Sequence, residues 1–471
     1  MSDDLLFLTV TEQAKLLRSR KVSSVELTQA YLQALRTRGT ALRAVAEITE
    51  EVALQQAQQA DKEIASGKYR GVLHGIPYGA KDLFATKGIP ARWGSPAHRD
   101  QCFDYDASVI ERLHRAGAVL VAKLAMIELA GAGGYEFAHA SLTGACLNPW
   151  DTTRWAGGSS SGSGAAVAAG AVGFALGTET WGSITVPAAF CGVTGLRPTY
   201  GRVSRYGAMA LSWTMDKIGP MARSAEDCAH ILQAIAGHDP RDPSSSDVPF
   251  RYRFSTWRNR RFRIGLLPVD FAKNNATDAE RCFRDALEVF KGRKMEFVEV
   301  KLPDLPFNEA AEVIIVAEGS SAFENLIRSG KVNELADQSQ AVGLLSGLTL
   351  SAVDYLRAMR VRAEASRAMA KVFERCDVLM APTLLQGALP VDRSLNETWV
   401  NMGGNGGFAN LTGLPSISVP MGFTAGGLPL GLEIIGAPYE EAKILALAQV
   451  FQQETEWHKK RPPVAGERIR T

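Results

Sequence analysis

The chain has 471 residues, of which 46% are hydrophobic and 22% are charged, a composition typical of a soluble globular protein with a buried core. Its 52 basic and 50 acidic side chains leave a formal net charge of +2, which excludes a strongly basic protein that binds nucleic acid. Intrinsic disorder and collagen-like repeats are also excluded. We therefore expect an ordinary soluble protein with no affinity for nucleic acid or membranes.

Six cysteines are scattered along the chain without a CxxC pair. Disulfide scaffolds and zinc ribbons need closer spacing, so we expect reduced thiols and a cytoplasmic location. The first residues include Asp3 and Asp4, where a signal peptide would be basic. The continuous apolar or glycine run from Ala165 to Leu176 is too short to span a bilayer and is typical of a buried helix.

Two capping boxes open the chain. Thr9 precedes Glu12 by three residues, and Ser23 precedes Glu26 by the same interval, which predicts a helix start at each pair. Helical periodicity then alternates with short apolar runs, and this alternation predicts an α/β fold with a mixed β-sheet core covered by helices on both faces. The predicted helices are 49–66, 224–235, 277–291, 351–375 and 439–456, and the predicted strands are 118–122, 263–267, 378–381, 416–420 and 430–435.

Residues 238–255 form the most loop-like stretch, because they are rich in Asp, Pro, Ser and Arg. Such a composition could mark a domain linker. Strands and helices nevertheless continue beyond it without a change in composition. We therefore expect one domain over residues 1–471, with 240–350 as its most variable part and a candidate lid or subdomain.

The most unusual segment is the glycine–serine loop from Gly157 to Gly164, which leads into the apolar run. A flexible linker is the simplest interpretation of its composition. A phosphate-binding loop would need a lysine after the last glycine, and the sequence has none there. A GxSxG hydrolase elbow matches Gly158 to Gly162 but must follow a strand, and residues 151–155 lack a strand pattern. The loop could instead gather backbone N–H groups and hydroxyls at a helix start.

A second glycine–serine site contains Ser183, in a turn before an apolar segment. Consecutive backbone N–H groups in such a turn can converge on an oxyanion, although most serines in turns only cap or fill. Histidines are scarce, so a nucleophilic serine would need another base, and a desolvated lysine is the available type. Lys81 has mostly small and apolar neighbours, although a lysine is more often a solvated surface residue.

Taken together, these segments resemble the amidase signature family. The resemblance begins with Gly75-Ile-Pro and Lys81-Asp82, and includes Gly157-Gly-Ser-Ser160 and the turn that ends in Gly182-Ser183. Its motifs follow one another in the family's order and span most of the chain, and only 240–350 carries little of the pattern. The remaining matching segments are 190–204, 216–220, 377–383 and 410–420.

The resemblance implies both a reaction and a site. Members of this family hydrolyse or transfer acyl groups at C–N bonds with a Ser–cis-Ser–Lys triad. On this chain it implies Ser183 as nucleophile, Ser159 as the bridging serine in a cis peptide and Lys81 as base. It implies neither a metal nor an organic cofactor. The backbone N–H groups of the oxyanion hole would come from Thr180, Trp181, Gly182 and Ser183.

Three positions depart from the family pattern. Trp181 replaces a usual glycine, Thr185 replaces a frequent arginine, and Glu179 stands where aspartate is common. We expect the Trp181 indole to narrow the substrate pocket or stack over it; Glu179 has no role that the sequence explains. The loop 130–135, including Gly133, resembles the family's substrate-facing loop and would leave room for a bulky acyl group. A plain structural turn is the alternative.

The leading functional hypothesis is a stand-alone serine amidase, a monomer or homodimer, for neutral and fairly hydrophobic amides or anilides. Carbamates (urethanes) are further candidate substrates, because they present the same trigonal carbonyl and nitrogen leaving group. The alternative is the glutaminase subunit of a tRNA-dependent amidotransferase, although Trp181 and Thr185 depart from its usual loop. A third hypothesis, a non-catalytic binding protein, is disfavoured because Lys81, Ser159 and Ser183 are all present.

Overall fold

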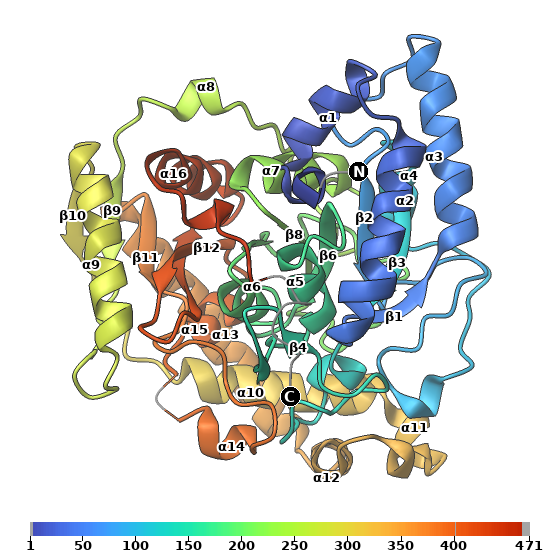
Figure 1. The fold of residues 1–471 in the computed structure, drawn as a ribbon. Helices are drawn as coiled ribbons and strands as arrows, with labels where there is room; N and C mark the ends of the chain where they lie inside the picture. The colour runs from blue at the N-terminus through green and yellow to red at the C-terminus, as the bar shows by residue number, and fades with distance from the viewer. Residues whose placement is uncertain (1–2, 401, 464–471) are drawn as a thin grey trace.

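The computed structural model describes residues 3–400 and 402–463, and an 11-stranded mixed β-sheet lies at its centre (Figure 1). The strands of this sheet are β1 (Val45–Ile48), β2 (Pro77–Lys81), β3 (Val119–Leu124), β6 (Phe174–Glu179), β7 (Thr194–Arg197), β8 (Lys217–Ala222), β9 (Arg263–Leu266), β10 (Glu296–Glu299), β11 (Val378–Pro382), β12 (Ser416–Phe423) and β13 (Pro429–Gly436). Their spatial order is β1-β3-β2-β6-β8-β7-β12-β13-β11-β9-β10. The runs β3-β2-β6 and β11-β9-β10 are parallel, and the other neighbours are antiparallel.

Helices cover both faces of this sheet. The helices are α1 (Val10–Arg18), α2 (Ser24–Ala34), α3 (Glu50–Ala65), α4 (Ser108–Arg115), α5 (Ser161–Ala168), α6 (Thr185–Cys191), α7 (Ala225–Ile235), α8 (Phe254–Trp257), α9 (Thr277–Gly292), α10 (Phe307–Ala322), α11 (Glu324–Arg328), α12 (Gln338–Gly347), α13 (Ala352–Arg375), α14 (Leu395–Thr398), α15 (Gly406–Leu411) and α16 (Glu441–Glu454). α5 and α6 pack on one face of the central strands, and α7 and α16 pack on the other (Figure 1). The predicted α/β fold with a mixed sheet is confirmed.

Both predicted capping boxes are present. The Thr9 hydroxyl accepts from the backbone N–H of Glu12, whose carboxylate accepts from the Thr9 N–H, and Ser23 and Glu26 repeat the arrangement. Each box satisfies two of the backbone donors that a helix start leaves without a partner. The two boxes therefore begin α1 and α2, as the sequence predicts.

Two sequence interpretations are wrong. Residues 151–155 do form a strand, β5 (Asp151–Trp155), which pairs with β4 (Leu147–Asn148) in a separate two-stranded sheet. Its partner is a hairpin neighbour rather than the central sheet, so its half-exposed sequence lacks an apolar pattern. The run from Ala165 to Leu176 is not one helix: α5 ends at Ala168, the chain turns at Gly170, and β6 begins at Phe174.

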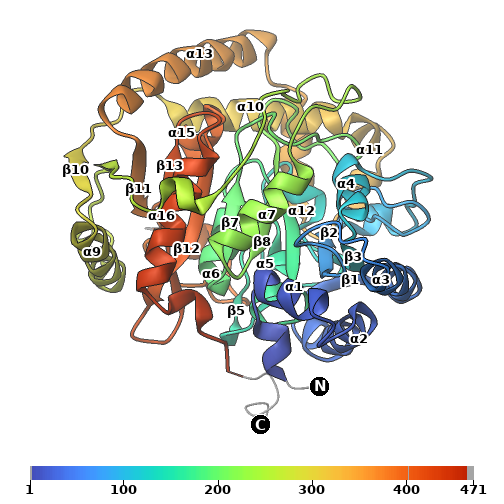
Figure 2. The ribbon, with the colours of Figure 1, turned by 90° about the horizontal axis from the view of Figure 1, so that it is seen from above.

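The segment 240–350 belongs to the same domain as the rest of the chain. Its strands β9 and β10 extend the central sheet beside β11, and α9 packs on β12 and β13. α10 runs alongside α13 at one end of the molecule (Figure 2). A lid role for part of this segment stays a prediction.

Two features bear on the expected location of the protein. All six cysteines lie within the described residues and are free thiols. Across residues 3–400 and 402–463, none of the helices combines the length and apolarity needed to cross a bilayer.

Candidate active site

Lys81 is the last residue of β2, in the interior of the sheet. Its side chain is fully buried, and its Nζ donates to the Ser159 Oγ at 2.7 Å and to the Thr178 Oγ1 at 2.9 Å. β2 and β6 are neighbouring parallel strands, so their carboxyl ends bring Lys81 and Thr178 to the same edge of the sheet. This lysine is therefore an interior residue, not a solvated one.

Ser159 lies in the glycine–serine loop that precedes α5. The Gly158–Ser159 peptide is cis, as the family resemblance implies. The Ser159 carbonyl oxygen accepts from the Ile127 N–H at 3.1 Å, and Gly157 has a φ of +85° with the Cα of Pro187 2.9 Å from where a β-carbon would lie. The loop is thus packed against its surroundings and is not a flexible linker.

Ser183 lies in the turn between β6 and α6, and only 8% of its surface is exposed. Gly182 has a φ of +83°, a conformation that L side chains rarely adopt. The Ser183 carbonyl oxygen accepts from the Ser160 N–H at 3.3 Å. This bond holds the Ser183 turn against the cis-peptide loop, so the structure brings Lys81, Ser159 and Ser183 into one site.

The electrostatic environment of Lys81 favours its neutral amine. Burial lowers the pKa of Lys81 to about 7, against the opposing attraction of the Asp216 and Glu179 carboxylates. A neutral amine can accept a proton, whereas the ammonium form cannot. The site therefore holds a lysine that can act as a base near neutral pH.

Glu179, which the sequence left unexplained, holds the Ser183 turn in place. Its carboxylate accepts from the backbone N–H groups of Ile184 at 2.8 Å and Thr185 at 3.0 Å. It also pairs with Arg197 at 2.6 Å, and both side chains are fully buried. Burial alone would raise the pKa of Glu179, but Arg197 and the hydrogen-bond donors hold it at about 2. Glu179 is therefore a charged positioning residue.

A second carboxylate ties the same turn to a neighbouring loop. Asp216 accepts from the Thr180 Oγ1 at 2.6 Å and from the backbone N–H groups of Leu211 and Ser212. Burial raises the pKa of Asp216 above its ordinary value. Sequence reasoning missed this role, although Asp216 lies in a segment that matches the family pattern. Thr180, a predicted oxyanion-hole residue, is thereby fixed at its side chain.

The indole of Trp181 packs on the start of α15. A β-carbon on Gly406 would lie 2.3 Å from the Trp181 Cδ1, so a larger residue there would displace the indole. Trp181 remains 37% exposed and lines a cavity of about 280 Å³ together with Trp399. This position agrees with an indole that narrows a pocket beside the Ser183 turn.

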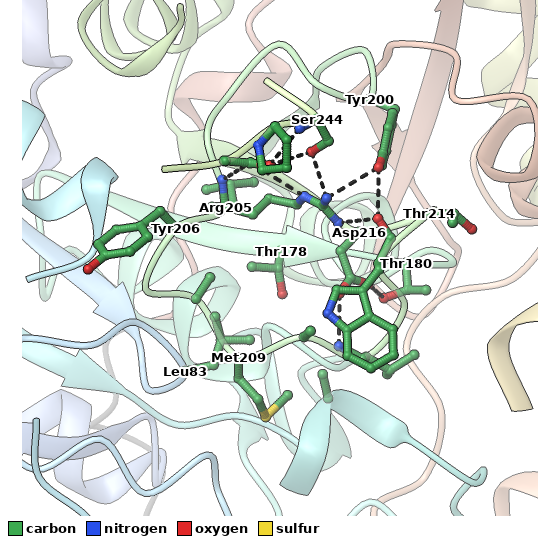
Figure 3. A pocket seen from close by; sticks show the side chains of 18 of the residues that line it. Leu83, Thr178, Thr180, Tyr200, Arg205, Tyr206, Met209, Thr214, Asp216 and Ser244 are labelled. Carbon is green, nitrogen blue, oxygen red and sulfur yellow. Dashed lines mark hydrogen bonds and ion pairs between the residues drawn. The ribbon is translucent and has the colours of Figure 1, made fainter. Parts of the chain in front are cut away.

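The other predicted substrate contact, Gly133, packs against α12. A β-carbon at Gly133 would lie 2.5 Å from the carbonyl oxygen of Gln340. The same loop reaches a larger cavity, of about 460 Å³, through Ala130 (Figure 3). A substrate-binding role for Gly133 itself stays a prediction. Among residues 3–400 and 402–463, no group of three His, Cys, Asp or Glu side chains is arranged to hold a metal ion.

Comparison with known proteins places this site in a family. The Amidase family matches residues 26–445. A glutamyl-tRNA(Gln) amidotransferase subunit from Chloroflexus aurantiacus is 39% identical, with 98% of this chain and 99% of that protein covered. The peptide amidase of Stenotrophomonas maltophilia has a TM-score of 0.83 at 32% identity, over 97% of this chain and 98% of that one. For the corresponding amidotransferase protein of Thermotoga maritima the values are 0.81 and 26%, over 99% and 100%. The chain therefore belongs to the amidase signature family, whose enzymes hydrolyse amides.

Proposed function

We propose that this enzyme cleaves amide C–N bonds through an acyl-enzyme on Ser183. The observation that carries the proposal is the buried Lys81 amine, 2.7 Å from the Ser159 hydroxyl and beside the Ser183 turn. Neutral Lys81 accepts a proton through Ser159 as the Ser183 Oγ attacks the carbonyl carbon. The C–N bond breaks as Ser159 returns a proton to the leaving nitrogen. Water then attacks the acyl-enzyme and releases the acid.

The activity is expected to rise with pH and level off above an apparent pKa near 7. Below this value the Lys81 amine is protonated and cannot accept the serine proton, so kcat/KM falls about tenfold per pH unit. The measurement is a kcat/KM profile on one neutral substrate. Enzyme held at each pH and then assayed at a common pH separates titration from unfolding. A flat profile across neutral pH would contradict the role of Lys81.

The substrates we propose are neutral, fairly hydrophobic amides or anilides, and carbamates of similar shape. Two cavities beside the Ser183 turn have largely apolar and aromatic residues in their walls, Met209 and Trp213 in one and Leu384 and Trp399 in the other. Buried apolar surface of this kind favours uncharged organic groups. In this form the enzyme acts alone, as a monomer or homodimer.

A glutaminase subunit of a tRNA-dependent amidotransferase is the second candidate. The relatives named as amidotransferase subunits support it, because 39% identity extends over 98% of this chain. That similarity is stronger than the 32% identity to a peptide amidase. The Ser183 turn itself favours the stand-alone enzyme, because Trp181 and Thr185 replace the residues usual in the glutaminase.

A matched substrate panel separates the two candidates. The panel contains an anilide, an aryl-amine carbamate, an ester and glutamine, each tested with the wild type and with Ser183→Ala. We expect anilide or carbamate turnover that disappears in the variant. Turnover of glutamine alone would instead support the amidotransferase role, and co-purifying partner chains would strengthen that result.

A further inference from the structure

Two of the cavities lie on different sides of the Ser183 turn. The first, of about 460 Å³, is lined by Leu83, Thr178, Thr180, Met209 and Trp213 among others, and we name it the lysine-side cavity. The second, of about 280 Å³, is lined by residues that include Trp181, Gly182, Thr185 and Trp399, and we name it the tryptophan-side cavity. The turn thus separates space for two halves of a substrate.

The chemistry of the leaving group distinguishes the two cavities. An amide nitrogen leaves only when it is protonated, and in the proposed mechanism that proton arrives through Ser159. The amine must therefore depart beside Ser159 and Lys81. Thr178 lines the lysine-side cavity and accepts from the Lys81 Nζ at 2.9 Å. The lysine-side cavity is thus one hydrogen bond away from the proton donor system.

The walls of the lysine-side cavity fit an uncharged group. Leu83 and Met209 lie on one side of Thr178, and Arg205 lies on the other with Tyr200 and Ser244 (Figure 3). The Arg205 guanidinium already donates to the Tyr200 hydroxyl and the Ser244 Oγ. It also faces the Asp242 carboxylate at 3.8 Å. Because this charge is balanced within the wall, the cavity offers no unpaired ion for a charged ligand.

Size and aromatic lining indicate an organic amine. A volume of about 460 Å³ falls within the range of roughly 300–1,000 Å³ that is typical of small-molecule sites, whereas ammonia would leave nearly all of it empty. The Trp213 side chain is 45% exposed at this wall and offers a ring face for stacking. We propose that the lysine-side cavity binds the amine half of the substrate and that this half is a neutral aromatic amine. The proposal rests on the acyl-enzyme mechanism proposed above.

The acyl-enzyme gives this assignment a kinetic signature. Once the C–N bond has broken, the amine leaves and only the acyl group remains on Ser183. Contacts to the amine therefore affect acylation and not deacylation, whereas contacts to the acyl group affect substrates with any amine. The variant Trp213→Ala removes an exposed ring, and the bonds from Tyr200 and Arg205 to Trp213 are retained because they reach its main-chain oxygen.

The experiment compares two substrates with one acyl group, acetyl-4-nitroanilide and acetamide. For Trp213→Ala we expect kcat/KM on the anilide to fall about tenfold, with acetamide and the single-turnover deacylation rate unchanged within about twofold. The matched variant Trp399→Ala, in the tryptophan-side cavity, should change both substrates by the same factor.

Two results would overturn the assignment: equal losses on both substrates in Trp213→Ala, or a slower deacylation in that variant. Failure of the acyl-enzyme mechanism is separately visible. In that case wild-type enzyme would give turnover without any acyl-enzyme in the single-turnover experiment, whatever the effect of Trp213→Ala.

Discussion

Ser183→Ala is expected to lower kcat on an anilide or carbamate by about 10⁶-fold, the loss seen when a serine hydrolase loses its nucleophile. The backbone of Ser183 is held by the Gly182 conformation and by the bond from the Ser160 N–H to its carbonyl oxygen. Both features are retained in alanine, so the variant removes the reacting atom and little else. The measurement is the initial rate at saturating substrate.

A matched control for Ser183→Ala is Ser163→Ala in α5. The Ser163 hydroxyl is buried and donates to the carbonyl oxygen of Leu176 at 3.0 Å, and it has no part in the proposed chemistry. We expect this control to remain within about tenfold of wild type, because one neutral hydrogen bond contributes about 1 kcal/mol. Comparable turnover in Ser183→Ala and Ser163→Ala would exclude Ser183 as nucleophile.

Glu179→Gln is expected to lower the free energy of unfolding by about 3–5 kcal/mol, the cost of leaving a buried charge without its partner. The substitution keeps the side-chain shape but removes the carboxylate that faces Arg197, which is fully buried. Lys217, also buried and opposite Glu179 in the sheet, loses the same negative neighbour. Two buried cations would then repel each other.

Chemical denaturation measures this loss, with Glu288→Gln as the matched control. Glu288 forms an ion pair with Lys291 that is more than half exposed on both sides, and such pairs contribute about 0–1 kcal/mol. A change in Glu179→Gln no larger than in Glu288→Gln would mean that the Glu179 carboxylate does not hold this region together.

The sequence predicts the outer strands and long helices of this fold better than the strands that carry the site. The predicted helix 277–291 corresponds to α9 at Thr277–Gly292, and the predicted strand 416–420 lies within β12. β2 and β6 were not predicted, because they are buried on both faces and contain glycines at Gly79 and Gly177. Such strands lack the alternating pattern that identifies a half-buried strand.

The candidate site divides in the same way. Lys81, Ser159 and Ser183 were identified because each lies in a short motif of small residues that the family resemblance covers. The roles of Glu179 and Asp216 could not be predicted, because their partners are distant in the sequence: Arg197 and Asn410 for Glu179, and Leu211 with Thr180 for Asp216. Charge pairing across a sheet depends on strand order, which single motifs do not specify.

The most direct test of the proposed mechanism is the mass of the enzyme during turnover. Wild-type protein is mixed with an aryl-amine carbamate or anilide, quenched in acid within one turnover, and analysed intact and after digestion. The mechanism predicts a mass increase equal to the acyl group, located on the peptide that contains Ser183 and absent in Ser183→Ala. An adduct on another residue, or turnover without any adduct on Ser183, would contradict it.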